Sequence, residues 1–98
     1  MKNKSIKLWS DEKEYLSNTL MQIRDAYGPN NEQRKPYDML LERLEQSKMS
    51  VVKDGTFCYV DLAGGSYEIC INALSKSNDI SAQTLLRKII DAPNKTHC

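Results

Sequence analysis

Residues 49–72, Met-Ser-Val-Val-Lys-Asp-Gly-Thr-Phe-Cys-Tyr-Val-Asp-Leu-Ala-Gly-Gly-Ser-Tyr-Glu-Ile-Cys-Ile-Asn, decide the fold that the sequence predicts. Two segments of this stretch, Phe57–Leu62 and Tyr67–Asn72, are rich in the aromatic and β-branched residues that are typical of strands. Between them, Gly64-Gly65 provides two residues that can take positive φ, as a type I′ turn requires. We therefore expect two antiparallel strands joined by a tight turn, with Asp61 opposite Glu68.

A second turn of the same kind is predicted at Asp54-Gly55. It would pair Met49–Lys53 with the strand that follows and complete a three-stranded meander. Because side chains alternate along a strand, one face of this sheet would be apolar. The other, outer face would carry Val52, Phe57 and Tyr59.

Two helices are expected before the sheet. Ser10 is a suitable N-cap, and apolar residues recur at helical spacing up to Tyr27, where Gly28-Pro29 ends the pattern. Pro36 fits the first turn of a second helix that ends near Ser47. The apolar stripes of the two helices comprise Leu16, Leu20, Ile23 and Tyr27, and Tyr37, Leu40, Leu41 and Leu44. The short connection predicts an antiparallel helical hairpin over residues 11–47.

The two ends of the chain complete the prediction. Ser81 can cap a third helix over residues 81–91, and Pro93 ends it, so residues 93–98 are expected to be a frayed tail. Residues 1–9 form a lead-in or an edge strand, and their lysines (Lys2, Lys4 and Lys7) are expected to be solvated, with contact to an acidic partner as the alternative. The fold class is α+β, a single two-layer ααβββα domain over residues 1–98. In it the helices pack on one face of a small antiparallel sheet, to which residues 1–9 could add a fourth, edge strand.

The composition excludes several classes of protein. The 98 residues include 14 basic and 13 acidic side chains, with no concentrated basic block, so we do not expect a nucleic-acid grip dominated by phosphate contacts. No apolar run approaches the roughly 20 residues of a membrane span, and the basic N-terminus lacks the apolar core of a secretory signal. The three cysteines are best explained as reduced thiols of a cytoplasmic protein.

The sequence predicts neither catalysis nor a bound cofactor. The single histidine, His97, falls in the expected tail, and Cys58 and Cys70 are expected on opposite faces of the sheet. The cysteine spacing resembles no zinc motif. Gly64-Gly65 is expected to form a turn rather than to open a helix, so a phosphate-binding loop is not predicted. We expect no catalytic residues, no metal and no cofactor.

Two surfaces are candidates for binding another protein. The outer sheet face, with Val52, Phe57 and Tyr59, is expected either to be covered by residues 6–9 or to contact a second copy or a different protein. The second candidate is an acidic ridge formed by Asp38, Glu42 and Glu45 on the second helix. It is either an ordinary solvent-exposed helix face or a surface that attracts a basic partner.

The function that these features favour is a small non-enzymatic protein-binding domain. It would act as an inhibitor, an immunity-type protein or an accessory protein of a phage or other mobile element, by masking its partner. The alternative is a nucleic-acid-binding regulator, since residues 37–48 and 51–57 resemble the helix and wing of a winged-helix domain. The acidic side chains on that helix would repel phosphates, which disfavours this alternative.

Overall fold

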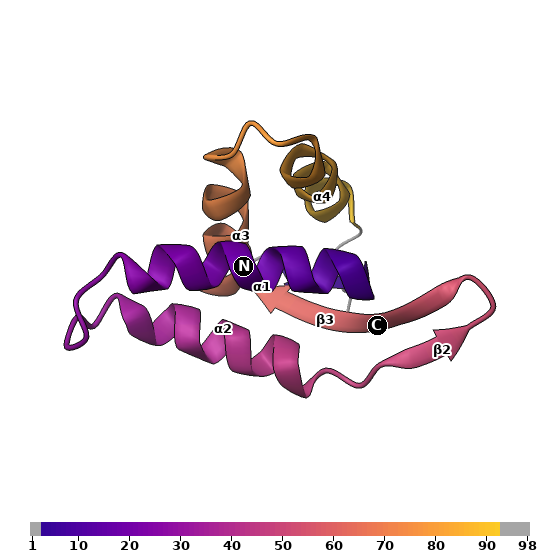
Figure 1. Ribbon diagram of the computed structural model, residues 1–98, viewed down its shortest axis with the longest axis horizontal. Coiled ribbons are helices and arrows are strands. Elements are labelled where there is room, and N and C mark those ends of the chain that lie inside the picture. The colour runs from indigo at the N-terminus through magenta and orange to yellow at the C-terminus, as the bar shows by residue number, and fades with distance from the viewer. Residues whose placement is uncertain (1–2, 93–98) are drawn as a thin grey trace.

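The computed structural model describes residues 3–92, and it has the predicted α+β architecture, with four helices and a three-stranded antiparallel sheet (Figure 1). The predicted tail, with His97 and Cys98, lies outside the described residues. In chain order the elements are β1 (Asn3–Trp9), α1 (Ser10–Asp25), α2 (Arg34–Gln46), β2 (Ser50–Val52), β3 (Gly55–Ala63), α3 (Gly65–Ser75) and α4 (Ile80–Asp91).

The sheet has the strand order β1-β3-β2, so the N-terminal segment is one of its three strands. β1 runs antiparallel to β3 over its whole length, with Ile6 opposite Val60 and Trp9 opposite Phe57. Of the two alternatives for this segment, a lead-in or an edge strand, the strand is the correct one. The Ile6 and Leu8 side chains lie on the inner, buried face.

The predicted third strand, Tyr67–Asn72, is wrong because these residues belong to α3. Their aromatic and β-branched composition suits a strand, but the apolar pattern has a helical period. Tyr67, Cys70, Ile71 and Leu74 follow one another at spacings of three, one and three, and all four are buried or half-buried. The element order ααβββα is therefore corrected to βααββαα, and Asp61 lies opposite Ser5 rather than Glu68.

Gly64-Gly65 is the junction between β3 and α3, and the predicted type I′ turn is wrong. Gly64 has φ 53° and ψ −120°, a conformation that strongly favours glycine, and Gly65 is the first helical residue. The two glycines do open a helix. The residues that follow, Ser66-Tyr67-Glu68, still match no phosphate-binding pattern.

The β2–β3 hairpin is present, but its register differs from the prediction. Its two turn residues are Lys53 and Asp54, and Val52 pairs with Gly55 instead of Phe57. The change shifts the partner by two positions, so each β2 side chain keeps its predicted face. Val52 accordingly remains on the same side of the sheet as Phe57.

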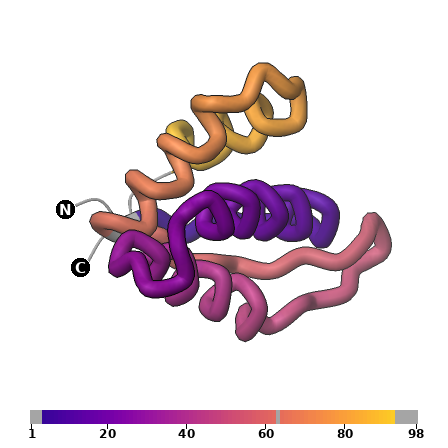
Figure 2. Tube along the Cα trace, turned by 60° about the vertical axis from the view of Figure 1, so that its left-hand side comes forward, coloured from indigo at the N-terminus to yellow at the C-terminus, as the bar shows by residue number. Residues whose placement is uncertain are grey.

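The first two helices form the predicted antiparallel hairpin, and both views show α2 returning beside α1 (Figures 1 and 2). The N-cap of α1 is Trp9 rather than Ser10, and the backbone N–H of Trp9 donates to Glu12 Oε1 at 3.0 Å. The strand thus passes directly into the helix. At α4 the cap is Asp79, whose carboxylate accepts from the Ser81 N–H, so the predicted Ser81 cap is also wrong.

The helices cover the inner face of the sheet and enclose one core. Lys4 is the one charged side chain that is buried among residues 3–92, which contradicts its predicted solvation. Among the described helices, none is both long and apolar enough to cross a membrane. The principal core residues are Ile6, Leu8, Leu16, Leu20, Leu40, Leu44, Cys58, Val60, Leu62, Cys70, Leu74, Leu85 and Ile89.

Candidate protein-binding surfaces

Three aromatic rings meet on the outer face of the sheet, where β1 lies beside β3. The Phe57 ring makes edge-to-face contacts with Trp9 on one side and Tyr59 on the other, at centroid distances of 5.7 and 5.6 Å. These are favourable geometries for aromatic pairs. We call Trp9, Phe57 and Tyr59 the aromatic cluster. The sequence predicted two of its members, and the pairing of Trp9 with Phe57 adds the third.

Lys7 belongs to the same surface, although the sequence did not predict its position over the aromatic rings. It lies opposite Tyr59 in the β1–β3 pairing, on the outer face. Its ammonium sits 4.5 Å from the Trp9 ring centroid and 4.4 Å from that of Phe57. The negative faces of both rings therefore attract this cation and hold it over the cluster.

The cluster is open to solvent to different degrees. Tyr59 is 61% exposed and Val52 is 43% exposed, whereas Trp9 and Phe57 are half-buried. Of the alternatives for this face, cover by residues 6–9 holds only for Phe57, on which the Trp9 and Lys7 side chains lie. Residues 6–9 are themselves part of a strand within the sheet and leave Tyr59 and Val52 exposed. The outer face thus presents aromatic and aliphatic side chains that the core does not use.

The acidic ridge is exposed, as predicted, and two of its three carboxylates have partners within the chain. Asp38 forms an ion pair with Arg24 at 3.2 Å, and Glu42 accepts from the Gln46 amide at 3.1 Å. Glu45 lines a groove of about 500 Å³ between α1 and α2. Arg24 therefore offsets part of the Asp38 charge, whereas Glu42, which accepts from a neutral amide, keeps its charge.

A groove of about 700 Å³ joins the two predicted surfaces. It runs between α2 and the part of β3 beyond the short strand β2, and both Glu42 and Tyr59 line it. Arg43 crosses the groove, and its Nη1 donates to the backbone carbonyl of Asp61 at 3.1 Å. Met39, 66% exposed, adds an apolar side chain to the same wall.

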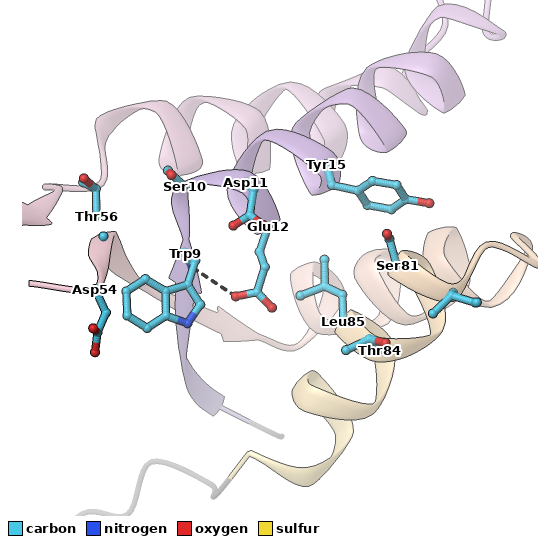
Figure 3. A pocket seen from close by; sticks show the side chains of 12 residues that line it. Trp9, Ser10, Asp11, Glu12, Tyr15, Asp54, Thr56, Ser81, Thr84 and Leu85 are labelled. Carbon is cyan, nitrogen blue, oxygen red and sulfur yellow. Dashed lines mark hydrogen bonds between the residues drawn. The ribbon is translucent and has the colours of Figure 1, made fainter.

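Another hollow of about 700 Å³, which Trp9 of the aromatic cluster also lines, lies between the first turns of α1 and α4 and the β2–β3 turn (Figure 3). Its carboxylates are Asp11, Glu12 and Asp54. Figure 3 shows the Trp9 indole beside the Glu12 carboxylate, with Tyr15 and Ser81 on the opposite side. Its lining comprises Trp9, Ser10, Asp11, Glu12, Tyr15, Asp54, Gly55, Thr56, Ile80, Ser81, Thr84 and Leu85.

The polar groups of this hollow serve the fold. Glu12 accepts from the Trp9 backbone and forms a 2.6 Å ion pair with Lys88, which ties α1 to α4. Tyr15 donates to Asp79 at 3.1 Å and links the same helices. Within residues 3–92, no three potential metal ligands gather in one place. The hollow was not predicted, because its walls come from segments far apart in the sequence.

Cys58 and Cys70 are both free and buried, and neither belongs to an exposed surface. Cys58 lies on the inner sheet face, whereas Cys70 lies in α3, so their predicted placement on opposite faces of a sheet is wrong. Burial raises the pKa of Cys70 to about 12 and also raises that of Cys58, which nearby Lys13 offsets in part. Both thiols are therefore protonated at neutral pH and poorly nucleophilic.

Comparison with known proteins found no matching family model, no matching curated protein and no matching solved structure. The arguments about function therefore rest on the surfaces described above.

Proposed function

We propose that this chain is a small non-enzymatic domain that binds another protein through the outer face of its sheet. The observation that supports the proposal most directly is the exposure of Tyr59, at 61%, within a cluster of three aromatic rings. Aromatic side chains are enriched in protein interfaces because they bury much area and lose little conformational entropy.

The proposed partner carries a carboxylate that meets Lys7. The ammonium of Lys7 is held over Trp9 and Phe57, so little freedom remains to be lost when it binds an anion. The groove that leads from Tyr59 to Glu42 extends the surface towards the acidic ridge. Asp38, Glu42 and Glu45 would then steer a basic region of the same partner.

The proposed role is the masking of that partner in the cytoplasm. Such a role suits a single small domain whose buried thiols are protonated and whose described carboxylates form no metal cluster. An inhibitor, an immunity-type protein or an accessory protein of a phage or other mobile element would act in this way. Fold alone does not distinguish these roles.

The test compares two surface variants in pull-downs from lysate of the source cells. Tyr59→Asp places a charge in the aromatic cluster, whereas Ile80→Asp changes a residue that is 79% exposed at the start of α4, outside the cluster. We expect the first variant to lose a partner that the second retains in simple stoichiometry. Equal retention by both variants would refute the proposed surface.

One observation favours the second candidate, a nucleic-acid-binding regulator. The β2–β3 hairpin follows α2 and projects beyond the helices, as a wing would (Figure 1). The exposed acidic residues of α2 oppose phosphate binding. Filter binding at low salt tests this candidate, because nonspecific nucleic-acid binders are retained when phosphate contacts are unscreened. The absence of retention at micromolar protein would eliminate it.

A further inference from the structure

The outer edge of β1 carries backbone groups whose direction can be deduced from two hydrogen bonds. The Asp61 carbonyl accepts from Arg43 on the α2 side, and Asp61 lies opposite Ser5. In an antiparallel ladder, opposite residues exchange both hydrogen bonds or neither. Ser5 therefore directs its N–H and C=O away from β3. The Trp9 N–H, which donates to Glu12, shows the same direction four residues further along β1.

Lys7 lies between these two positions and shares their orientation, because the direction of the backbone groups alternates along a strand. Ser5 and Lys7 together direct two N–H and two C=O groups towards the open edge. Within the described part of the chain, no strand pairs with this edge of β1. No hydrogen bond there engages these four groups.

The lysines of β1 leave this edge unobstructed. Natural proteins often protect an edge strand with charged side chains that reach out over it. Here the Lys7 ammonium lies 4.4 Å from the Phe57 ring centroid, on the neighbouring strand, and so leans over the sheet. The Lys4 ammonium is directed inward, to the Ile89 carbonyl of α4. Neither charge guards the edge.

We propose that β1 pairs antiparallel with β1 of a second copy of this chain, about a two-fold axis that passes through Ile6. The axis sets Ser5 opposite Lys7 of the second copy, and Lys7 opposite Ser5 of that copy. Ser5 and Lys7 of opposite copies then exchange two backbone hydrogen bonds in each pair, which makes four between the two β1 strands. A second copy of the chain is therefore a suitable partner, because the two-fold axis places Ser5 of each copy opposite Lys7 of the other.

The same register keeps like charges apart. A pairing centred on Lys7 would place two ammonium groups opposite each other, which is unfavourable. The axis through Ile6 joins the two three-stranded sheets into one six-stranded sheet. The outer faces of the two copies lie on the same side of it. Both aromatic clusters then face the same direction. This inference goes beyond the proposed partner surface and does not depend on it.

The first test measures the mass of the protein in solution between about 1 μM and 1 mM by light scattering after size exclusion. We expect twice the mass of one chain at the higher concentrations. Ser5→Pro removes the outward N–H and leaves the β1–β3 hydrogen bonds intact, since this N–H does not face β3. It should raise the dissociation constant of the dimer at least about tenfold, because the substitution removes one hydrogen bond from each copy and so two from each dimer. Ser5→Ala, which keeps the N–H, should have no effect.

A dimer that persists in folded Ser5→Pro would overturn the proposal, and so would a wild-type protein that is monomeric at 1 mM. Circular dichroism establishes that the variant is folded. Tyr59→Asp separates the two possible dimers, because it lies on the outer face and should not affect pairing through the edge. Loss of the dimer in Tyr59→Asp alone would assign self-association to the aromatic cluster and overturn the edge pairing.

The second test determines the register and does not depend on the proline variant. In a Cys98→Ser background, the double variant Ser5→Cys/Lys7→Cys should form a covalent dimer under mild oxidation, because residues 5 and 7 of the two copies lie opposite each other. Ser5→Cys alone should remain non-covalent, since residue 5 does not face its own copy. The axis through Ile6 would be refuted if Ser5→Cys alone formed a covalent dimer and the double variant formed no more of it than the single variant.

Discussion

Lys4 Nζ donates a hydrogen bond of 3.2 Å to the backbone carbonyl of Ile89, and it donates another to Ile90. A side chain of the first strand thus caps the last helix. The final carbonyls of a helix lack intrahelical donors and carry the negative end of the helix dipole, so an ammonium is well placed there. The Tyr67 ring centroid lies 5.2 Å from the same nitrogen. These contacts account for the burial of a lysine in the core.

The replacement of Lys4 by methionine should lower the free energy of unfolding by about 1–3 kcal/mol. Methionine keeps the length of the side chain but removes the charge-assisted bonds to the carbonyls of α4. Lys7→Met is the matched control, because Lys7 is half-exposed over two rings and should cost roughly 0.5–1 kcal/mol. Urea unfolding measures both. An equal cost for the two variants would contradict the capping role.

Gly64→Ala should destabilise the protein by about 1–2 kcal/mol, because φ 53° with ψ −120° strains any residue with a Cβ. Gly65→Ala provides the control. Gly65 begins α3, and a Cβ there would meet no atom within 4 Å. Alanine at this position should be neutral or stabilising by up to about 1 kcal/mol. If both variants behave alike in thermal unfolding, Gly64 does not adopt this positive-φ conformation in the folded protein.

The stability of the protein should fall in alkaline solution, partly because of Cys70. Burial raises the pKa of this thiol from its ordinary 9.0 to about 12. Above pH 9 the thiol of the unfolded chain loses its proton, whereas that of the folded chain keeps it. The contribution of Cys70 to the free energy of unfolding is therefore complete below pH 9 and is lost progressively up to about pH 12. Cys70 alone contributes a decrease of about 1.4 kcal/mol per pH unit in this window.

Chemical denaturation at several pH values between 8 and 11 measures this slope. Cys70→Ala should be less stable at neutral pH, because it leaves a small cavity, but its stability should depend less steeply on pH. The comparison uses the difference in slope, since other groups also titrate in this range. Identical slopes in the variant and the wild type would show that Cys70 ionises normally in the folded protein.

Within the aromatic cluster, Phe57 and Tyr59 should differ in their contribution to stability. Phe57 contacts two rings and is half-buried, so Phe57→Ala should cost about 1–2 kcal/mol. Tyr59 is largely exposed, and Tyr59→Ala should change the free energy of unfolding by less than about 0.5 kcal/mol. Thermal unfolding distinguishes them. A large cost at Tyr59 would place this side chain in the core and argue against its role in binding.

The sequence correctly predicted the elements in which the spacing of apolar residues matches the period of a helix or a strand. Leu16 and Leu20, and likewise Leu40 and Leu44, repeat at helical spacing on faces that are buried in the structure. Ile6 and Leu8 alternate as a strand requires. The exposed positions of Val52 and Tyr59 also followed from alternation, which survives a register shift of two residues.

The errors arose where composition and periodicity disagreed. Tyr67–Asn72 has the composition of a strand, yet its apolar spacing continues to Leu74 as a helix. Gly64 suits a hairpin turn as well as a junction that opens a helix, since both need positive φ. The role of Lys4 depends on the position of Ile89 in α4, 85 residues away. Such long-range contacts are not encoded in any local pattern.

The pairing of β1 with β3 determines the order in which the structure can assemble. β1 is the first element described in the chain, but its partner strand lies beyond both α1 and α2. On the ribosome β1 must therefore remain without its partner until β3 has been synthesised. Contacts of short sequence separation, such as those within the α1–α2 hairpin and between β1 and α1, can form earlier. During synthesis, the β1–β3 pairing can therefore form only after both helices of the hairpin have been made.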